Sequence, residues 1–188
     1  MLSVLTSRQF GAMRNAMGSI DLPLVEDLAD RIAAASRVVM YAQWGDLPPA
    51  KELHMRLLRI GIPAWLHEGE YEAEVNAGLL DPSGVAILIS RSGEGSFGEK
   101  FFAMARSRKA LTVVVTGEPS STLAGSADVT MFTGTRVGST WTDYFAGRTS
   151  DSLATALLFV LVAQRMPLVV RSGERHLLYN EPTARGSD

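Results

Sequence analysis

Three serines and two glycines lie close together in one short segment of the chain, residues 89–96 (ISRSGEGS). The segment follows an apolar run typical of a buried strand and precedes a stretch with helical periodicity. Open parallel α/β sheets bind ligands at the carboxyl ends of their strands. Glycine lets the backbone approach a ligand closely, and the first turn of a helix presents unpaired N–H groups and a positive dipole. The segment is therefore a candidate cradle for a phosphate group.

The side chains of this segment support two interpretations. Ser90, Ser92 and Ser96 offer hydroxyl groups to a phosphate, and Gly93 and Gly95 leave room for it. The same residue types also build tight strand-to-helix turns and helix caps in proteins that bind no anion there. Spacing alone does not choose between the two interpretations.

Five segments rich in β-branched or apolar residues alternate with segments of helical periodicity, which predicts an α/β fold with parallel strands joined by crossover helices. The predicted strands are residues 37–42, 63–66, 85–89, 111–116 and 128–132. The predicted helices are residues 23–35 and 48–60, one that starts near Phe97, and one around residues 153–161. The N-terminal segment is loosely helical and is expected to add a further helix, whereas residues 134–147 are predicted to form an irregular loop.

The composition indicates one globular domain. The chain has 188 residues, of which 46% are hydrophobic, and a net charge of -2 without a basic run that could neutralise a row of phosphates. It has no cysteine, and its three histidines lie far apart in sequence, so we expect no disulfide, metal site or cofactor. The longest apolar stretch, residues 153–162, is too short to span a bilayer. We therefore expect a cytoplasmic protein that binds neither nucleic acid nor a membrane directly.

The serine-rich segment resembles the signature of the SIS (sugar isomerase) domain, in which a strand ends in serine, any residue, serine, glycine, glutamate and threonine. The positions before the threonine match, ending at Glu94. Gly95 replaces the threonine, and the hydroxyl of Ser96 could take its place in a shifted geometry. The resemblance implies that a phosphate or another anionic group is held by Ser90, Ser92, Gly93, Glu94, Gly95 and Ser96.

The similarity extends over residues 21–165 and includes RVVMYA, AKELHMRLLRIG, VVVTGEPSSTLAGSADV and FAGRTSDSLATALLFVL. It implies a flavodoxin-like SIS fold, which is a three-layer αβα sandwich around a five-stranded parallel sheet. It also implies a homodimer, because SIS domains pair through their helices. The expected division of the chain is an N-terminal helix or arm at residues 1–20, the SIS domain at residues 21–170 and a polar C-terminal tail at residues 171–188.

AKELHMRLLRIG, together with Arg148 ahead of the last helix, is most similar to the effector domain of RpiR-type transcriptional regulators, in which a SIS domain senses a phosphosugar. The resemblance implies a non-enzymatic domain that binds a phosphorylated sugar or a related anionic small molecule. Such regulators carry a helix-turn-helix domain ahead of the SIS domain, and this chain begins too close to the SIS domain to hold one. We therefore expect a truncated regulator or a stand-alone relative, which would reach DNA only through the missing domain.

The loop after the first strand departs from the family pattern. Ala42 and Trp44 stand where the family has glycines, and Asp46 stands where a serine is expected and would repel an anion. In one interpretation Trp44 stacks on a sugar or another ligand, while Gln43 and Asp46 hydrogen-bond its hydroxyl groups. In the other, which we favour, Trp44 packs in the core or at a subunit interface.

An aldose–ketose isomerase would need a base that moves a proton between adjacent carbons. Glu94 lies in the serine-rich segment, but the family has glutamate there in sensors and enzymes alike. His54 lies on a predicted helix between apolar neighbours, and Glu68 opens an acidic run typical of a solvated loop. Two alternatives to the regulator remain. One is a stand-alone isomerase resembling 3-hexulose-6-phosphate isomerase, which the altered first loop disfavours, and the other is a degenerate SIS dimerisation module whose pocket is filled by Trp44.

Overall fold

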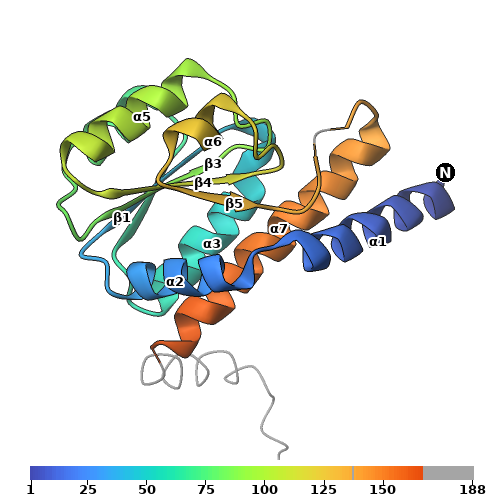
Figure 1. Cartoon of the computed structure of the whole chain (residues 1–188), viewed down its shortest axis with the longest axis horizontal. Helices are drawn as coiled ribbons and strands as arrows, with labels where there is room; N and C mark the ends of the chain where they lie inside the picture. Colours follow the sequence, from blue (N-terminus) through green and yellow to red (C-terminus); the bar gives the residue numbers. More distant parts are fainter. Residues whose placement is uncertain (137, 167–188) are drawn as a thin grey trace, which may run out of the picture.

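The sheet at the centre of the protein has five strands, all parallel (Figure 1). The computed structural model describes residues 1–136 and 138–166, so the predicted tail at residues 171–188 lies outside the described residues. The strand order is β2-β1-β3-β4-β5, which is the flavodoxin-like order. The five predicted strands are confirmed as β1 (Val38–Ala42), β2 (Ala64–His67), β3 (Val85–Ile89), β4 (Leu111–Thr116) and β5 (Val129–Phe132).

Helices cover both faces of this sheet (Figure 1). One face carries α2 (Leu22–Ala33), α3 (Leu47–Arg59) and α7 (Trp141–Gln164), and the other carries α4 (Glu70–Ala77), α5 (Ser96–Ser107) and α6 (Thr122–Ser126). Side chains alternate along a strand. Met40 therefore packs in the first core and its neighbour Tyr41 in the second. These two cores confirm the predicted three-layer αβα sandwich.

The start of α7 differs from the prediction. Residues 134–147 were expected to form an irregular loop, but the helix begins at Trp141. The hydroxyl of Thr140 accepts a hydrogen bond from the backbone N–H of Asp143 and so caps the first turn. This turn projects from the sandwich, and the Trp141 side chain is 78% exposed. Because the turn buries little, it has no apolar periodicity from which a helix could be predicted.

The N-terminal helix α1 (Leu2–Ser19) lies alongside α7 rather than on the sheet (Figure 1). Ala12 and Ala16 are its buried residues. Gly134 lies in the connection between β5 and α7 and lets this connection approach α1 closely. Its φ is +82°, and a Cβ at this position would lie 2.2 Å from the Cα of Ala16. The face of α1 turned away from α7 leaves large apolar side chains exposed, among them Phe10 and Met17.

Within the described part of the chain, α7 is long and apolar enough to cross a membrane, judged by length and composition only. Half of its apolar window is buried inside the protein, where Leu158 and Val162 pack against the sheet. A core helix of a soluble protein has the same properties. The apolar composition of α7 is therefore explained by its place in the sandwich.

Candidate functional site

A cavity of about 360 Å³ opens at the carboxyl ends of β1 and β3. Two loops meet there: residues 42–49, here called the first loop, and residues 90–96, here called the serine loop. Open parallel sheets bind ligands at this edge. Most of the residues predicted to contact a ligand line the cavity, namely Gln43, Trp44, Asp46, Ser90, Ser92, Glu94 and Gly95.

Gly93 and Ser96, the other two predicted ligand residues, are absent from the cavity lining. Gly93 has a φ of +66°, and a Cβ there would lie 1.9 Å from the Oγ of Ser121. Its N–H donates to the carbonyl oxygen of Ser90 and its own carbonyl accepts from the N–H of Leu123. Gly93 therefore folds the serine loop onto α6, and only glycine fits there.

Ser96 is the first residue of α5, and Gly95 precedes it as the N-cap with a φ of +128°. No side chain of the described residues caps this helix end. The first N–H groups of a helix have no partner within the helix, and an anion is favoured near them. The N-terminus of α5 thus brings hydrogen-bond donors to the serine loop.

Glu94 holds the serine loop against α6. One carboxylate oxygen of Glu94 accepts from the backbone N–H of Thr122 at 3.2 Å, and the other accepts from the Thr122 hydroxyl at 2.8 Å. Both oxygens are therefore engaged in positioning the loop. A catalytic role of Glu94 would have to use the remaining lone pairs of a carboxylate that already positions the loop.

The other two catalytic candidates lie away from the cavity. The Nε2 atom of His54 is 3.1 Å from the carbonyl oxygen of Ala64 on β2. Glu68 forms an exposed ion pair with Lys51 at 2.7 Å. Neither His54 nor Glu68 lines the cavity. Among the described residues there is also no cluster of three or more His, Cys, Asp or Glu side chains that could hold a metal ion.

Asp46 is not the isolated negative charge that the sequence indicated. Its Oδ1 accepts hydrogen bonds from the guanidinium of Arg148 on α7 and from the backbone N–H of Arg91, the latter at 3.2 Å. The positive charge of Arg148 balances the carboxylate. Repulsion of an anion by Asp46 stays a prediction, and its pairing with Arg148 reduces the charge that would cause it.

Trp44 lies at the mouth of the cavity with its side chain 87% exposed. Packing of Trp44 in the core, one of the possibilities that we favoured from the sequence, is therefore wrong. Its backbone has a φ of +51°, which is rare for a bulky residue and suits glycine. This conformation agrees with its resemblance to a family glycine. The cavity is open and Trp44 does not fill it.

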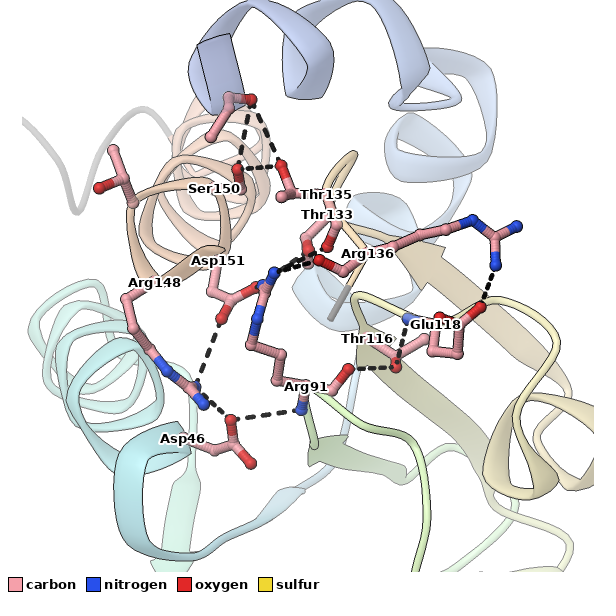
Figure 2. Close-up of polar contacts among 12 residues, drawn as sticks. Asp46, Arg91, Thr116, Glu118, Thr133, Thr135, Arg136, Arg148, Ser150 and Asp151 are labelled. Atoms are coloured by element: carbon pink, nitrogen blue, oxygen red, sulfur yellow. Dashed lines mark hydrogen bonds and ion pairs between the residues drawn. The ribbon is translucent and has the colours of Figure 1, made fainter. Parts of the chain in front are cut away.

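The serine loop itself contains a buried arginine, Arg91, that the sequence did not point to. The side chain of Arg91 is 5% exposed and donates to Asp151 at 2.9 Å and to the carbonyl oxygens of Thr135 and Arg136 at 2.9 and 3.0 Å. Figure 2 shows Arg91, Asp151, Arg148 and Asp46 converging between the serine loop and α7. Nothing in the pattern of residues 89–96 marks this arginine as buried, because it stands between two loop serines.

Two ionisable groups near the cavity are shifted by burial. Burial raises the pKa of Asp151, against the opposing effects of Arg91, the Thr133 hydroxyl and Arg148. Burial and the nearby Glu70 raise the pKa of Tyr41 to about 12, so its phenol remains neutral and can donate a hydrogen bond in the cavity. The cavity thus combines a neutral phenol, the ion pair of Asp46 and Arg148, and the Glu94 carboxylate that is hydrogen-bonded to Thr122.

A parallel α/β sandwich with a cavity over a serine-rich strand-to-helix loop is the architecture of a ligand-binding α/β domain. The sequence profile of the SIS domain family matches residues 31–164. This match covers most of the chain. The protein therefore belongs to the SIS domain family, as its serine-rich segment predicted.

The chain is 24% identical over 161 residues to an uncharacterized HTH-type transcriptional regulator of Thermotoga maritima, and the match covers 86% of this chain and 58% of the relative. Its fold is similar to that of the Vibrio vulnificus NanR protein complexed with ManNAc-6P, with a TM-score of 0.86, 18% identity and coverage of 98% of this chain and 70% of that chain. The sugar isomerase domain of an RpiR transcription factor from Sphaerobacter thermophilus is also similar, with a TM-score of 0.80, 16% identity and coverage of 94% and 97%. The chain spans little more than half the length of the curated relatives that it matches. These comparisons confirm the SIS fold and the predicted similarity to RpiR-type regulators.

Proposed function

We propose that this chain is the effector-sensing SIS domain of an RpiR-type transcriptional regulator and that its cavity binds a phosphorylated sugar. The observation that carries the proposal is the junction of the serine loop with the N-terminus of α5, which no described side chain caps. Phosphate is favoured where helix N–H groups and serine hydroxyls meet. A cavity of about 360 Å³ lies in the size range of small-molecule sites, which is roughly 300–1,000 Å³.

Ser90, Ser92 and Ser96 are the proposed hydroxyl donors at the phosphate end, with Gly93 and Gly95 shaping the loop. The hydroxyls of Ser90 and Ser92 now accept from backbone N–H groups of the loop itself, those of Gly93 at 3.2 Å and of Glu94 at 3.4 Å. The protons of these two hydroxyls are not used in those bonds. A bound phosphate would accept hydrogen bonds from these two hydroxyl groups.

Gln43, Trp44 and Asp46 are proposed to contact the sugar end. Asp46 accepts through Oδ1 from Arg148 and Arg91, so its Oδ2 can accept from a sugar hydroxyl. Trp44 presents an exposed ring at the mouth of the cavity, where it could stack on an apolar sugar face. Because the charge of Asp46 is balanced by Arg148, this carboxylate opposes an anionic ligand less than an unpaired one would.

A regulator, rather than an isomerase, is favoured by the contacts of Glu94. Both of its carboxylate oxygens accept hydrogen bonds from Thr122, so taking a proton from a substrate would compete with the contacts that hold the serine loop. We further propose a cytoplasmic homodimer, with the domain division expected from the sequence. Contact with DNA is proposed to belong to a separate helix-turn-helix domain of the longer regulator, as in the HTH-type relatives.

The proposal is tested by the thermal stability of the purified chain in the presence of ManNAc-6P, glucosamine 6-phosphate and fructose 6-phosphate. A ligand that binds the folded state alone raises the melting temperature. Ser92→Ala should weaken binding by about tenfold or more, as expected for the loss of a hydrogen bond to a charged group. Ser107→Ala is the matched control, because this serine lies at the far end of α5 and its hydroxyl donates to the carbonyl oxygen of Met104.

The outcomes separate the three functions. A rise in melting temperature that is lost in Ser92→Ala and kept in Ser107→Ala supports the sensor. Conversion of the bound sugar phosphate between its aldose and ketose forms would show an isomerase instead. An unchanged melting temperature with a broad panel of sugar phosphates, sugar acids and amino-sugar phosphates would favour the dimerisation module.

A further inference from the structure

The serine loop is fixed to α7 from behind by one buried side chain. The guanidinium of Arg91 donates to Asp151 on α7 and to two backbone carbonyls of the connection between β5 and α7. Each of these bonds involves a charged group, which makes them stronger than neutral hydrogen bonds. Gly147 on α7 lies directly against this guanidinium. The serine loop therefore has little room to move without α7 and this connection.

The first loop reaches the same aspartate by a second route. Arg148 donates to Asp46 in the first loop and lies 3.4 Å from the Oδ2 of Asp151. Asp46 in turn accepts the backbone N–H of Arg91. Both loops that wall the cavity are thus bonded, through one arginine each, to Asp151, whose Oδ1 also accepts from the Thr133 hydroxyl at 2.9 Å (Figure 2).

The residues next to the ion pair of Arg91 and Asp151 hold α1 in place. The hydroxyl of Thr135 lies 2.6 Å from that of Ser150, the residue before Asp151, and Ser150 donates to the carbonyl oxygen of Ala12 on α1 at 3.3 Å. The carbonyl group of Thr135 accepts from Arg91. A continuous set of polar contacts therefore joins the serine loop, through α7 and the β5–α7 connection, to the middle of α1 (Figure 2).

We propose that Arg91 and Asp151 are positioning residues that couple the serine loop to the seating of α1 on α7. A buried ion pair resists separation, because either partner left alone would be an uncompensated buried charge. A displacement of the serine loop is therefore transmitted to the β5–α7 connection on which α1 rests. The coupling is a property of the ligand-free chain. Its use to report to α1 the binding of a sugar phosphate rests on the proposed function.

The coupling is tested by hydrogen–deuterium exchange of the full chain without any ligand. Ser150→Ala removes the hydrogen bond from Ser150 to Ala12 and the contact between the Ser150 and Thr135 hydroxyls. It leaves the longer hydrogen bond from Thr135 to Ala12, at 3.5 Å, and the ion pair of Arg91 and Asp151 in place, so the chain should fold. Gly134→Ala is a stronger variant, because its Cβ would meet the Cα of Ala16 at 2.2 Å. In both variants the amides of residues 90–96 should exchange about fivefold faster, the factor expected when one hydrogen bond is lost.

Two further variants make this result specific. Arg165→Gln breaks the contacts that join the end of α7 to Asp30 on α2, which are not part of the contacts between the serine loop and α1. It should leave the exchange rates of residues 90–96 unchanged. In an Asp151→Asn background, which removes the charge and keeps the shape, Ser150→Ala should no longer accelerate the serine loop further. Arg91→Lys provides a second background if Asp151→Asn does not fold.

The proposal is overturned if α1 exchanges faster in Ser150→Ala and Gly134→Ala while residues 90–96 keep their wild-type rate. It is also overturned if Arg165→Gln accelerates the serine loop as much as Ser150→Ala does. Neither outcome depends on whether a sugar phosphate binds. Failure of the proposed function and failure of the coupling are therefore distinguishable.

Discussion

The Arg148 guanidinium on α7 and the Asp46 carboxylate in the first loop form an ion pair in which each side chain is only 19% exposed. The pair lies at the wall of the cavity and fixes the first loop to the last helix of the fold. It differs from the ion pair at the C-terminal end of α7, between Arg165 and Asp30, in which the Asp30 side chain is 63% exposed. The two pairs have the same chemistry and different solvent exposure, which makes them a matched set.

Asp46→Asn should lower the free energy of unfolding by about 1–3 kcal/mol, because it leaves a largely buried guanidinium with only its longer contact to Asp151, at 3.4 Å, as an ion pair. Asp30→Asn should leave the free energy of unfolding unchanged within error, since exposed ion pairs contribute little. Urea denaturation of both variants and the wild type measures this. Equal stabilities of the two variants would contradict the structural role of the Asp46–Arg148 pair.

Gly93→Ala should destabilise the chain by at least about 1–3 kcal/mol, the range for a non-glycine residue forced into a left-handed conformation. The added Cβ would also overlap the Ser121 hydroxyl. Gly125→Ala in α6 is the control, because a Cβ there meets no atom within 4 Å, and its stability should be equal to wild type or higher by up to about 1 kcal/mol. Thermal unfolding of both variants compares them. A stable Gly93→Ala protein would show that the serine loop has an alternative fold.

Glu94→Gln should keep most of the rise in melting temperature that a bound sugar phosphate produces. An amide oxygen still accepts one of the two hydrogen bonds from Thr122, so the loss of stability should be at most about 1 kcal/mol. An isomerase that used Glu94 as its base would instead lose about 10²–10⁴ of its turnover. Thermal shift and an isomerisation assay on the same preparation distinguish a loop-positioning residue from a catalytic one.

His67 should make the chain less stable in mildly acidic solution. Burial lowers the pKa of His67, and His54 adds to this effect while Glu72 opposes it. A histidine with a lowered pKa stays neutral in the folded chain. Its contribution to the free energy of unfolding is complete above the ordinary pKa of about 6.5 and is lost as the pH falls through the lowered pKa. His67→Gln should reduce the fall in stability between pH 7.5 and pH 5.5 measured by urea denaturation. NMR titration of the His67 ring gives the pKa directly.

An identical fall in stability in His67→Gln and wild type over this pH range would exclude the histidine as its cause. At pH 7.5 the ring is neutral in both the folded and the unfolded chain. The difference in free energy of unfolding between the two proteins should therefore not depend on pH there. The lower-pH slope is therefore the informative quantity.

The sheet could be predicted from the sequence because its strands are apolar on both faces. Residues 85–89 (VAILI) and 111–116 (LTVVVT) are continuous apolar runs of the kind that central parallel strands require. The first turn of α7 could not be predicted in this way, since Trp141 and Phe145 face the solvent and the helix is started by the Thr140 cap. Periodicity reports burial, and it fails where a helix leaves the core.

The serine loop could be located from the sequence because strand, turn and helix signals agree there. The electrostatics of the site could not, because they depend on residues brought together by the fold. Asp46 and Arg91 find their charged partners on α7, far along the chain, and no local pattern pairs them. The exposure of Trp44 was likewise missed, because a tryptophan is more often packed than left at the edge of a cavity.

The contact between Arg91 and Gly147 has a consequence for how this family can vary. A Cβ at position 147 would lie 1.9 Å from the Cζ of Arg91, so alanine at 147 is compatible only with a shorter or differently placed side chain at 91. Conversely, replacing Arg91 by a small residue removes the shorter of the two ion pairs of Asp151 and leaves a void beside α7. Substitutions at positions 91, 147 and 151 should therefore be coupled in stability, and we expect a SIS domain that carries a small residue between its two loop serines to tolerate a larger residue than glycine at the position corresponding to 147.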